Sequence, residues 1–343
     1  MEDGLNLRSR QILEAIIEDY ISTAEPIGSS AIRSRHGLSL SPATIRNVMA
    51  DLEELGFLSS PHTSAGRVPT EKAYRFYVDS LLAVGGVDRG EREEIRRRCT
   101  MAGKDVEGVF RGVSQMLSSV SHYMGIVAAP SFNSNVFRQI EFIPLGGRRI
   151  LAILVSQSGS VQNRIVELER DISADDLQKM TNYLNEMLHG LTISQVKGKI
   201  VREMEGERAR YDEMLANALR LSQQALDDVG EEIFIEGQAN ILDLPEFADV
   251  QKMKDIFRAM EQKSQLLTVL DSCLKAPGVN IFIGSESHLN SMSGLSMITS
   301  TYVSGKNTLG VLGVIGPTRM GYGKVIPIVD YTARMLTRML HVD

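Results

Sequence analysis

The sequence predicts an α+β protein made of more than one domain. With 343 residues, the chain is long enough to form two or three hydrophobic cores. Its composition, with 43% hydrophobic and 23% charged residues, is ordinary for a globular protein. Helix-like and strand-like patterns alternate along the chain, and a glycine-rich, charged stretch at 83–91 separates the first part from the rest.

Three helical patterns occur within residues 5–55. Apolar residues recur at helical spacing over 7–22, and a short second helix is expected over 29–36, where a following glycine tolerates a left-handed helix end. A third helix is expected over 42–55, because Ser41 is a good N-cap and the proline after it suits the first helical position. This spacing is typical of a helix-turn-helix motif.

The third helix has an apolar side and a polar side that includes small residues. Ala43 and Asn47 lie on the polar side, where the small alanine lets another surface approach closely, and Thr44 and Arg46 flank them. In a DNA groove, Asn47 can pair with adenine, Arg46 with guanine or a phosphate, and Ala43 can touch a thymine methyl group. These residues lie in the N-terminal half, where a recognition helix usually meets base edges. We therefore expect this helix to bind duplex DNA.

The net charge of −6 does not exclude a nucleic acid as a partner, since phosphate contacts need only a local positive face. Such a face is present between residues 28 and 50, which include three arginines and one histidine but no acidic residue. The acidic residues Asp51, Glu53 and Glu54 follow at the far end of the third helix, away from the predicted DNA contact.

Two short strand-like runs, 57–61 and 67–69, flank a small polar segment at 62–66 and predict a hairpin wing. Arg67 is placed to reach a phosphate or the minor groove. A further helix is expected over 71–82, and the whole predicts a winged helix-turn-helix domain. The candidate DNA-binding residues are Arg33, Arg35, Ser41, Ala43, Thr44, Arg46, Asn47, His62, Thr63, Ser64, Gly66 and Arg67.

Two other interpretations of this domain stay open. A helix face with one arginine and one asparagine is more often simply solvated, and winged helices also serve as protein-binding modules. DNA binding is favoured because four signals coincide: the helix-turn-helix spacing, the capped third helix, the basic stretch without acidic residues and the polar wing.

Beyond a linker expected at 83–92, strand-rich regions enclose a helical block. The block spans roughly 171–275, and its last helix, expected over 244–274, carries apolar residues close to a heptad pattern. The simplest interpretation is a strand-rich domain in two parts, 93–170 and 276–343, interrupted by that block. Strands are expected at 125–129, 136–143, 149–155, 161–166, 279–283, 295–303 and 308–315, and helices at 91–124, from 174 onward, at 195–229 and at 322–340.

No catalytic, cofactor-binding or metal-binding pattern is recognisable. The six histidines are scattered, and Cys99 and Cys273 fit no metal or redox spacing. Two cysteines make no disulfide framework, which suits a reducing compartment. The N-terminus lacks the apolar core of a signal peptide, and no apolar run approaches the roughly 20 residues of a membrane span. We therefore expect a soluble, cytoplasmic protein that is not an enzyme and carries no cofactor.

Both ends of the chain closely resemble the HrcA family, the bacterial heat-inducible repressors of chaperone operons. In the N-terminal part, the resemblance lies in the segments 27–29, 40–49, 52–56 and 62–70. In the C-terminal part, it lies in residues 315–320, Tyr322 and 325–327. The middle of the chain is less diagnostic.

The resemblance implies three parts: the winged helix over 1–82, a GAF-like domain over 93–170 and 276–343, and a mainly helical dimerisation domain inserted at 171–275. It also implies a homodimer that binds an inverted-repeat operator upstream of chaperonin and chaperone genes. A GroEL-type chaperonin would be the partner that keeps the repressor competent.

A GAF-like domain often holds a small ligand, so an effector-gated regulator stays open as an alternative. A winged-helix scaffold that binds only proteins is another. No cluster of polar residues in 125–170 or 279–320 indicates a particular effector, and a purely structural platform is therefore favoured.

Overall fold

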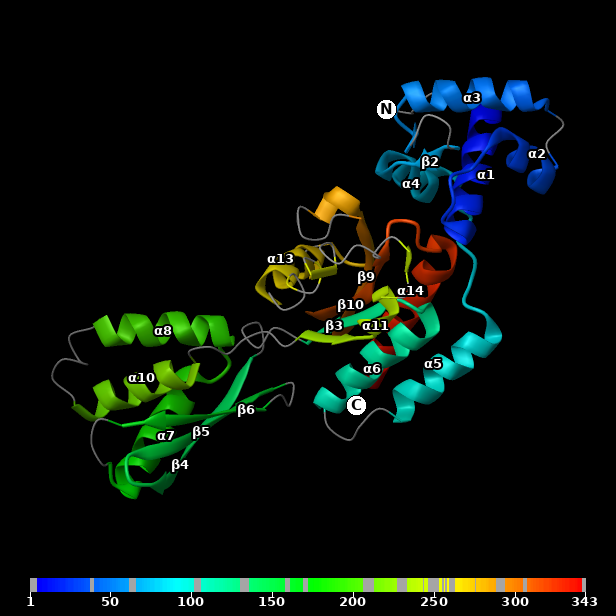
Figure 1. The fold of residues 1–343 in the computed structure, drawn as a ribbon. Helices are drawn as coiled ribbons and strands as arrows, with labels where there is room; N and C mark the ends of the chain where they lie inside the picture. The colour runs from blue at the N-terminus through cyan, green and yellow to red at the C-terminus, as the bar shows by residue number, and fades with distance from the viewer. Residues whose placement is uncertain are drawn as a thin grey trace. The chain divides into compact units, whose positions relative to one another are not determined.

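A computed structural model of the 343-residue chain shows an α+β protein, as the sequence predicts (Figure 1). The chain divides into two compact units, the first formed by residues 1–128 and 233–343 and the second by 129–232. The structure describes residues 5–37, 40–61, 66–101, 106–129, 136–157, 161–168, 172–205, 213–226, 233–242, 244–245, 253–254, 256, 258, 263–274, 276–287, 294–304 and 307–340.

The first unit begins with the predicted winged helix-turn-helix. Its core is formed by fully buried side chains from α1 and α3, among them Ile12, Ile16, Ile45 and Leu52, together with Phe57. The expected helices are confirmed to within about one residue at their ends. The elements are α1 (Leu7–Thr23), α2 (Ser29–His36), α3 (Pro42–Glu54), β1 (Leu58–Ser59), β2 (Val68–Pro69), α4 (Glu71–Phe76) and the π-helix η1 (Tyr77–Leu81).

The rest of the first unit is an α+β domain, called the platform below (residues 89–128 and 233–340). Its five-stranded antiparallel sheet has the order β7-β3-β10-β9-β8. The strands are β3 (Met124–Ala128), β7 (Ile233–Glu236), β8 (Val279–Ile283), β9 (Leu295–Ser304) and β10 (Asn307–Pro317). The helices are α5 (Arg89–Met101), α6 (Val106–Ser121), α11 (Ala239–Leu242), α13 (Lys263–Leu274), the short 3₁₀-helix η4 (Gly284–Ser287) and α14 (Tyr322–Leu340).

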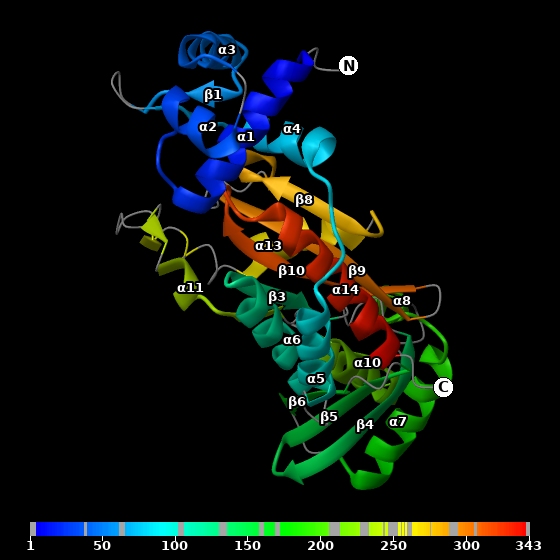
Figure 2. The same cartoon turned by 90° about the vertical axis from the view of Figure 1, so that its right-hand side faces the viewer.

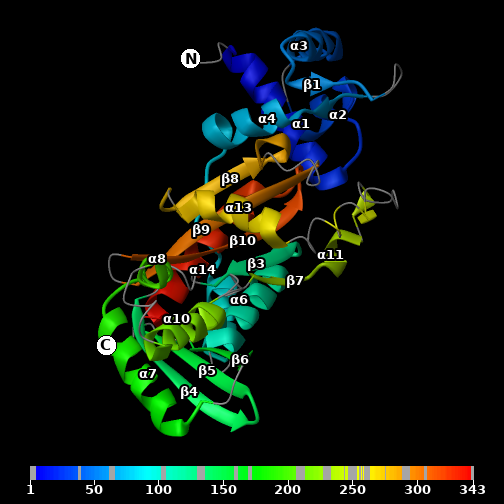
Figure 3. The same ribbon diagram turned by 90° about the vertical axis from the view of Figure 1, so that its left-hand side faces the viewer.

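Helices cover both faces of the platform sheet. Helix α13 lies on the face seen in Figure 3, and α14 lies on the opposite face, seen in Figure 2. Alternating residues of β3 follow this division: Met124 and Ile126 share an apolar core with Leu266 and Leu270 of α13, whereas Gly125 faces α6. Strand β7 has no counterpart among the strands predicted from the sequence.

The second unit is a separate α+β layer pair. Strands β4 (Phe137–Gly146), β5 (Arg149–Ser156) and β6 (Val161–Glu167) form an antiparallel sheet of their own. Helices α7 (Ala174–Leu188), α8 (Ile193–Glu205) and α10 (Glu213–Leu226) pack together, with α7 and α10 against one face of this sheet, over a continuous apolar core. The strands and helices therefore stabilise each other by burying one shared surface.

These boundaries differ from those expected. The sequence patterns place strands β4 to β6 in the domain part 93–170, yet among the described residues they form a sheet with one another and pack against helices of the second unit. The sequence patterns place helix α13 in the block 171–275, yet it packs on the platform sheet. The inserted unit is therefore α+β rather than mainly helical, and helix α5 begins at Arg89, inside the linker expected at 83–92.

The expected helix over 195–229 corresponds to α8 and α10, and the helix over 244–274 is described mainly at its end, as α13. Three residues of its predicted apolar stripe, Val250, Phe257 and Met260, lie outside the described residues. The second unit leaves the platform after Ala128 and returns at Ile233, and these two residues are directly paired across β3 and β7.

Gly125→Ala is expected to destabilise the platform by about 1–3 kcal/mol, because strand β3 passes too close to α6 for a side chain. A Cβ at this position would lie 2.0 Å from the Ser114 carbonyl oxygen. Thermal unfolding followed by circular dichroism measures the change. Gly198→Ala in α8 is the control, because the added Cβ meets no heavy atom within 4 Å beyond the backbone of its own helix; an equal loss in both variants would contradict the packing argument.

Candidate nucleic-acid interface

Helix α3 begins at the cap that the sequence predicts. The Ser41 hydroxyl accepts a hydrogen bond from the Thr44 amide at 3.1 Å, and Pro42 occupies the first turn. The Thr44 hydroxyl lies 2.9 Å from the Ser41 hydroxyl, so both predicted site residues help to fix the start of the helix. The cap also places the positive end of the helix dipole at this terminus.

One side of α3 is buried and the other is exposed. Ile45, Met49 and Leu52 are buried against the core of the domain. Spacing of three and four residues along a helix keeps side chains on one face. The exposed residues at that spacing are Ala43, Arg46, Asn47 and Ala50.

The exposed face of α3 is suited to a DNA groove. Two alanines leave little bulk, so the backbone can approach base edges closely. Asn47 offers both a donor and an acceptor, and Arg46 offers a planar fork of donors that matches guanine or a phosphate. The structure thus brings Ala43, Arg46 and Asn47 together as predicted.

The arginines of α2 differ in their surroundings. Arg33 and Arg35 are both exposed. Arg35 also forms an ion pair with Asp19 of α1, with 3.4 Å between Nη1 and Oδ2, and His36 Nε2 lies 3.0 Å from Asp19 Oδ1. Asp19 therefore connects the two helices, a role that its place on a mostly apolar helix face did not indicate. The predicted phosphate contacts of Arg33 and Arg35 stay predictions.

Arg67 joins the wing to the recognition helix. Its Nε donates to Glu53 Oε2 at 2.8 Å and its Nη1 to the Ser60 hydroxyl at 3.1 Å, while its backbone pairs with Ile27. The side chain is only 27% exposed. In this structure the guanidinium is held by a carboxylate of α3, and its predicted contact with a phosphate requires that pair to open. Gly66 lies beside it; His62, Thr63 and Ser64 lie outside the described residues.

Neither thiol is placed for chemistry. Cys99 and Cys273 are buried, and burial raises the pKa of the Cys99 thiol to about 11. Within the described ranges, no three histidine, cysteine or acidic side chains gather as a metal site would require. No helix in the described part of the chain is long and apolar enough to cross a membrane.

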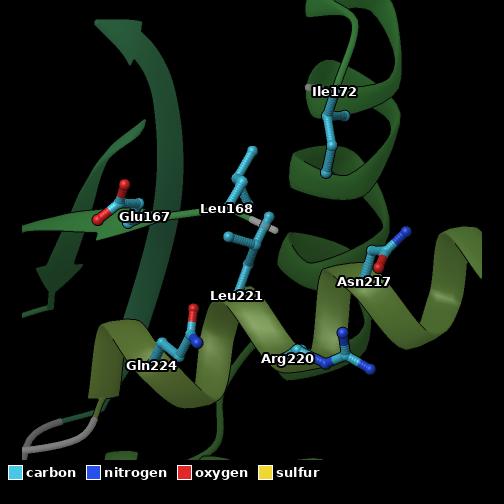
Figure 4. Close-up of a pocket in the computed structure, with 7 residues that line it drawn as sticks. All are labelled: Glu167, Leu168, Ile172, Asn217, Arg220, Leu221 and Gln224. Atoms are coloured by element: carbon cyan, nitrogen blue, oxygen red, sulfur yellow. The ribbon is translucent and has the colours of Figure 1, made fainter. Parts of the chain in front are cut away.

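The second unit contains a small open pocket between the end of β6 and helix α10 (Figure 4). It is lined by the polar residues Glu167, Asn217, Arg220 and Gln224 and by the apolar residues Leu168, Ile172 and Leu221. Its volume is about 40 Å³. Ligand pockets usually measure roughly 300–1,000 Å³, so this one suits ordered water better than a metabolite.

Helix α3 is capped, its exposed face carries small residues and an arginine, and the wing pairs with its C-terminal end through Arg67 and Glu53. These features define a winged helix-turn-helix DNA-binding protein. Residues 5–79 match the family model described as a winged helix-turn-helix transcription repressor, HrcA DNA-binding. Residues 107–326 match the model of the HrcA protein C-terminal domain. The chain belongs to the HrcA family and is a heat-inducible transcription repressor, not an enzyme.

Relatives support this membership along the whole chain. The chain is 63% identical over 333 residues to the heat-inducible transcription repressor HrcA of Geobacter sulfurreducens, covering 97% of each protein. It is 42% identical over 339 residues to that of Syntrophobacter fumaroxidans, covering 98% of this chain and 97% of the relative. A crystal structure of a hypothetical protein aligns over 99% of both chains with a TM-score of 0.60 at 20% identity, which shows a shared fold alone.

Ser41→Ala is expected to lower the free energy of unfolding of the winged helix by about 1 kcal/mol, because the Thr44 amide loses its acceptor. Hydrogen exchange of the amides at 44–46 measures the fraying of the first turn. Ser41→Asn is the matched control, since asparagine also caps helices well. Exchange that is equally fast in both variants, or unchanged in both, is inconsistent with the capping role.

Proposed function

We propose that this repressor acts as a cytoplasmic homodimer that binds an inverted-repeat operator upstream of chaperonin and chaperone genes. The observation that carries the proposal is the exposed face of α3, formed by Ala43, Arg46, Asn47 and Ala50. Two such faces related by a twofold axis match the two halves of an inverted repeat. The name of the relatives, heat-inducible transcription repressor, supports the link to heat-stress genes.

In this proposal the platform is a GAF-like domain and the second unit is the inserted dimerisation domain. A five-stranded antiparallel sheet covered by helices on both faces supports the first assignment. The insertion of a complete unit between β3 and β7 supports the second, because such a unit can form contacts without disturbing the platform sheet.

The outer face of the β4–β5–β6 sheet is the surface that we propose for dimerisation. Ile143, Leu151 and Ile165 are aligned across the three strands and form an apolar row. Ile143 is 38% exposed, Ile165 57% and Val161 55%. Exposed apolar rows of this kind are typical of protein interfaces, and a second copy of the same face satisfies twofold symmetry.

A GroEL-type chaperonin is the proposed partner that keeps the repressor competent. On heat stress, unfolded clients draw the chaperonin away, the repressor loses its active fold and transcription rises. Marginal stability supplies the physical basis, because a loss of about 1–2 kcal/mol changes the folded fraction several-fold.

Arg46→Ala and Asn47→Ala are each expected to weaken operator binding by about 1–3 kcal/mol, or about 5- to 150-fold, because each removes a base contact. Mobility shift with an inverted-repeat duplex and a scrambled duplex measures both affinity and sequence preference. Glu54→Gln, at the far end of α3, is the control and is expected to stay within about twofold of the parent.

Parental affinity in both variants would show that α3 does not read the operator. A parent that binds duplexes without preference for the inverted repeat favours the protein-interaction scaffold instead. The chaperonin is tested in the same assay: after mild heating, added chaperonin is expected to raise the fraction of bound operator, and an unchanged fraction contradicts that part of the proposal.

Ile165→Asp is expected to convert the dimer to a monomer, because it places a charge in the exposed apolar row, at its end on strand β6. Light scattering coupled to size exclusion measures the molecular mass. Val201→Asp is the matched control: Val201 is an exposed apolar residue, 45% accessible, on helix α8 of the same unit. A dimer that survives Ile165→Asp, or that is lost equally in both variants, rules out this face.

A further inference from the structure

Helix α4 is firmly attached to the end of the recognition helix. Lys72 Nζ donates to the Leu55 carbonyl at 3.0 Å and lies 4.4 Å from the centre of the Phe57 ring. The Thr70 hydroxyl, just before α4, lies 2.8 Å from the Gly56 carbonyl oxygen and 3.1 Å from that of Phe57. Because these contacts hold the three residues that directly follow α3, we treat the two helices as one rigid piece.

The other side of α4 is attached to the platform. Arg75 Nε donates to Glu286 Oε1 at 2.9 Å, and Nη2 donates both to Glu286 Oε2 and, at 2.7 Å, to the Ile281 carbonyl. Glu71 Oε2 accepts hydrogen bonds from the amide and the hydroxyl of Ser285 at 3.1 and 2.6 Å. A guanidinium that binds a carboxylate through two nitrogens fixes the angle between its partners as well as their distance.

Two further contacts join the winged helix to the platform. Arg319 Nη1 donates to the Ile21 carbonyl near the end of α1 at 3.0 Å. The rings of Tyr74 and Tyr322, both buried, have centroids 6.1 Å apart. Contacts at separate places on α1 and α4 fix an orientation, which a single contact cannot do.

The approach of α4 to the platform is close and charged. Gly284 has φ +55°, and a Cβ there would lie 1.8 Å from Glu71 Oε1. Burial acts to raise the pKa of Glu286, but hydrogen bonds from Arg75 and from the Ile283 amide lower it below its ordinary value. The carboxylate therefore stays ionised at neutral pH, where the contact with Arg75 is complete.

The linker between the winged helix and the platform does not fix the orientation of one relative to the other. Residues 82–88 form no helix or strand, and residues 83–86, which include two glycines, are exposed. A segment of this composition limits the distance between two domains but leaves their angle free. The angle is therefore set by the side-chain contacts.

We propose that Glu71 and Arg75 are positioning residues for operator recognition, which fix the angle of α3 and hence the half-site spacing that the dimer accepts. This inference rests on the proposed function, because it requires a dimer on an inverted repeat. Two recognition helices can read two half-sites only at a set separation, typically about 34–36 Å. A winged helix that turns on its platform accepts several spacings.

The contact is suited to orientation rather than to holding the fold together. The Arg75 and Glu286 side chains are 32% and 37% exposed. Ion pairs this exposed add little to stability, so their loss leaves the winged helix folded.

The experiment compares the full-length parent with Arg75→Glu on inverted-repeat duplexes whose half-site spacing is changed in steps of one base pair. A shift of two base pairs turns one half-site by about 70° around the duplex, so the parent is expected to lose about tenfold in affinity there. Arg75→Glu is expected to lose less than about threefold over the same shift, because the new carboxylate repels Glu286 and the Ile281 carbonyl, which opens the contact of α4 with the platform and lets the winged helices turn. Its affinity for a duplex with a single half-site is expected to equal that of the parent.

Two controls separate orientation from a general structural effect. The double variant Arg75→Glu with Glu286→Arg restores a pair of opposite charges and is expected to regain part of the spacing preference. Arg334→Glu removes an ion pair with Asp330 inside α14 and is expected to keep the parental preference. An unchanged spacing profile in Arg75→Glu overturns the proposal, and so does an equal loss on the single half-site and on every spacing.

A measurement without DNA distinguishes the failure of the positioning proposal from the failure of the proposed function. Spin labels at Ala50→Cys on α3 and Ser272→Cys on α13, in chains diluted with unlabelled protein, report the distance between winged helix and platform. The distribution is expected to be narrow in the parent background and broad with Arg75→Glu, and equal widths overturn the positioning role. If the parent shows no preference for the inverted repeat, but the distance distribution broadens with Arg75→Glu as expected, only the proposed function is refuted.

Discussion

The burial of one side of helix α3 is the interaction on which the recognition surface depends. Ile45, Met49 and Leu52 anchor the helix in a core shared with α1, and this decides which side chains face outward. A rotation of the helix by one residue would turn Arg46 toward that core, where an unpaired polar group is costly. The chemistry of the exposed face is therefore fixed by packing on the opposite face.

Much of this surface could be predicted because its signals are local. The N-cap at Ser41, the helical spacing of the apolar residues and the small residues opposite them all lie within one short segment of sequence. The pairing of Arg67 with Glu53 could not be predicted, since it depends on how the wing folds back over the end of α3. A charged residue in the sequence shows what it can bind, not which partner the fold brings to it.

The same limit explains the domain boundaries. Nearly every strand of the described chain could be located from its alternating or apolar pattern, with β7 as an exception. A strand's pattern does not state its neighbours, however, and β4 to β6 looked equally suited to the platform sheet. Helix α13 was likewise recognised as apolar on one side, while the surface that it covers, the platform sheet, lies far away in sequence.

The second unit leaves and re-enters the platform at one directly paired position, Ala128 opposite Ile233. Its two attachment points are thus neighbours, so the inserted segment can lengthen, shorten or drift in sequence while the strands that flank it keep their register. Such an arrangement lets natural selection act on the insertion and on the DNA-reading part almost independently.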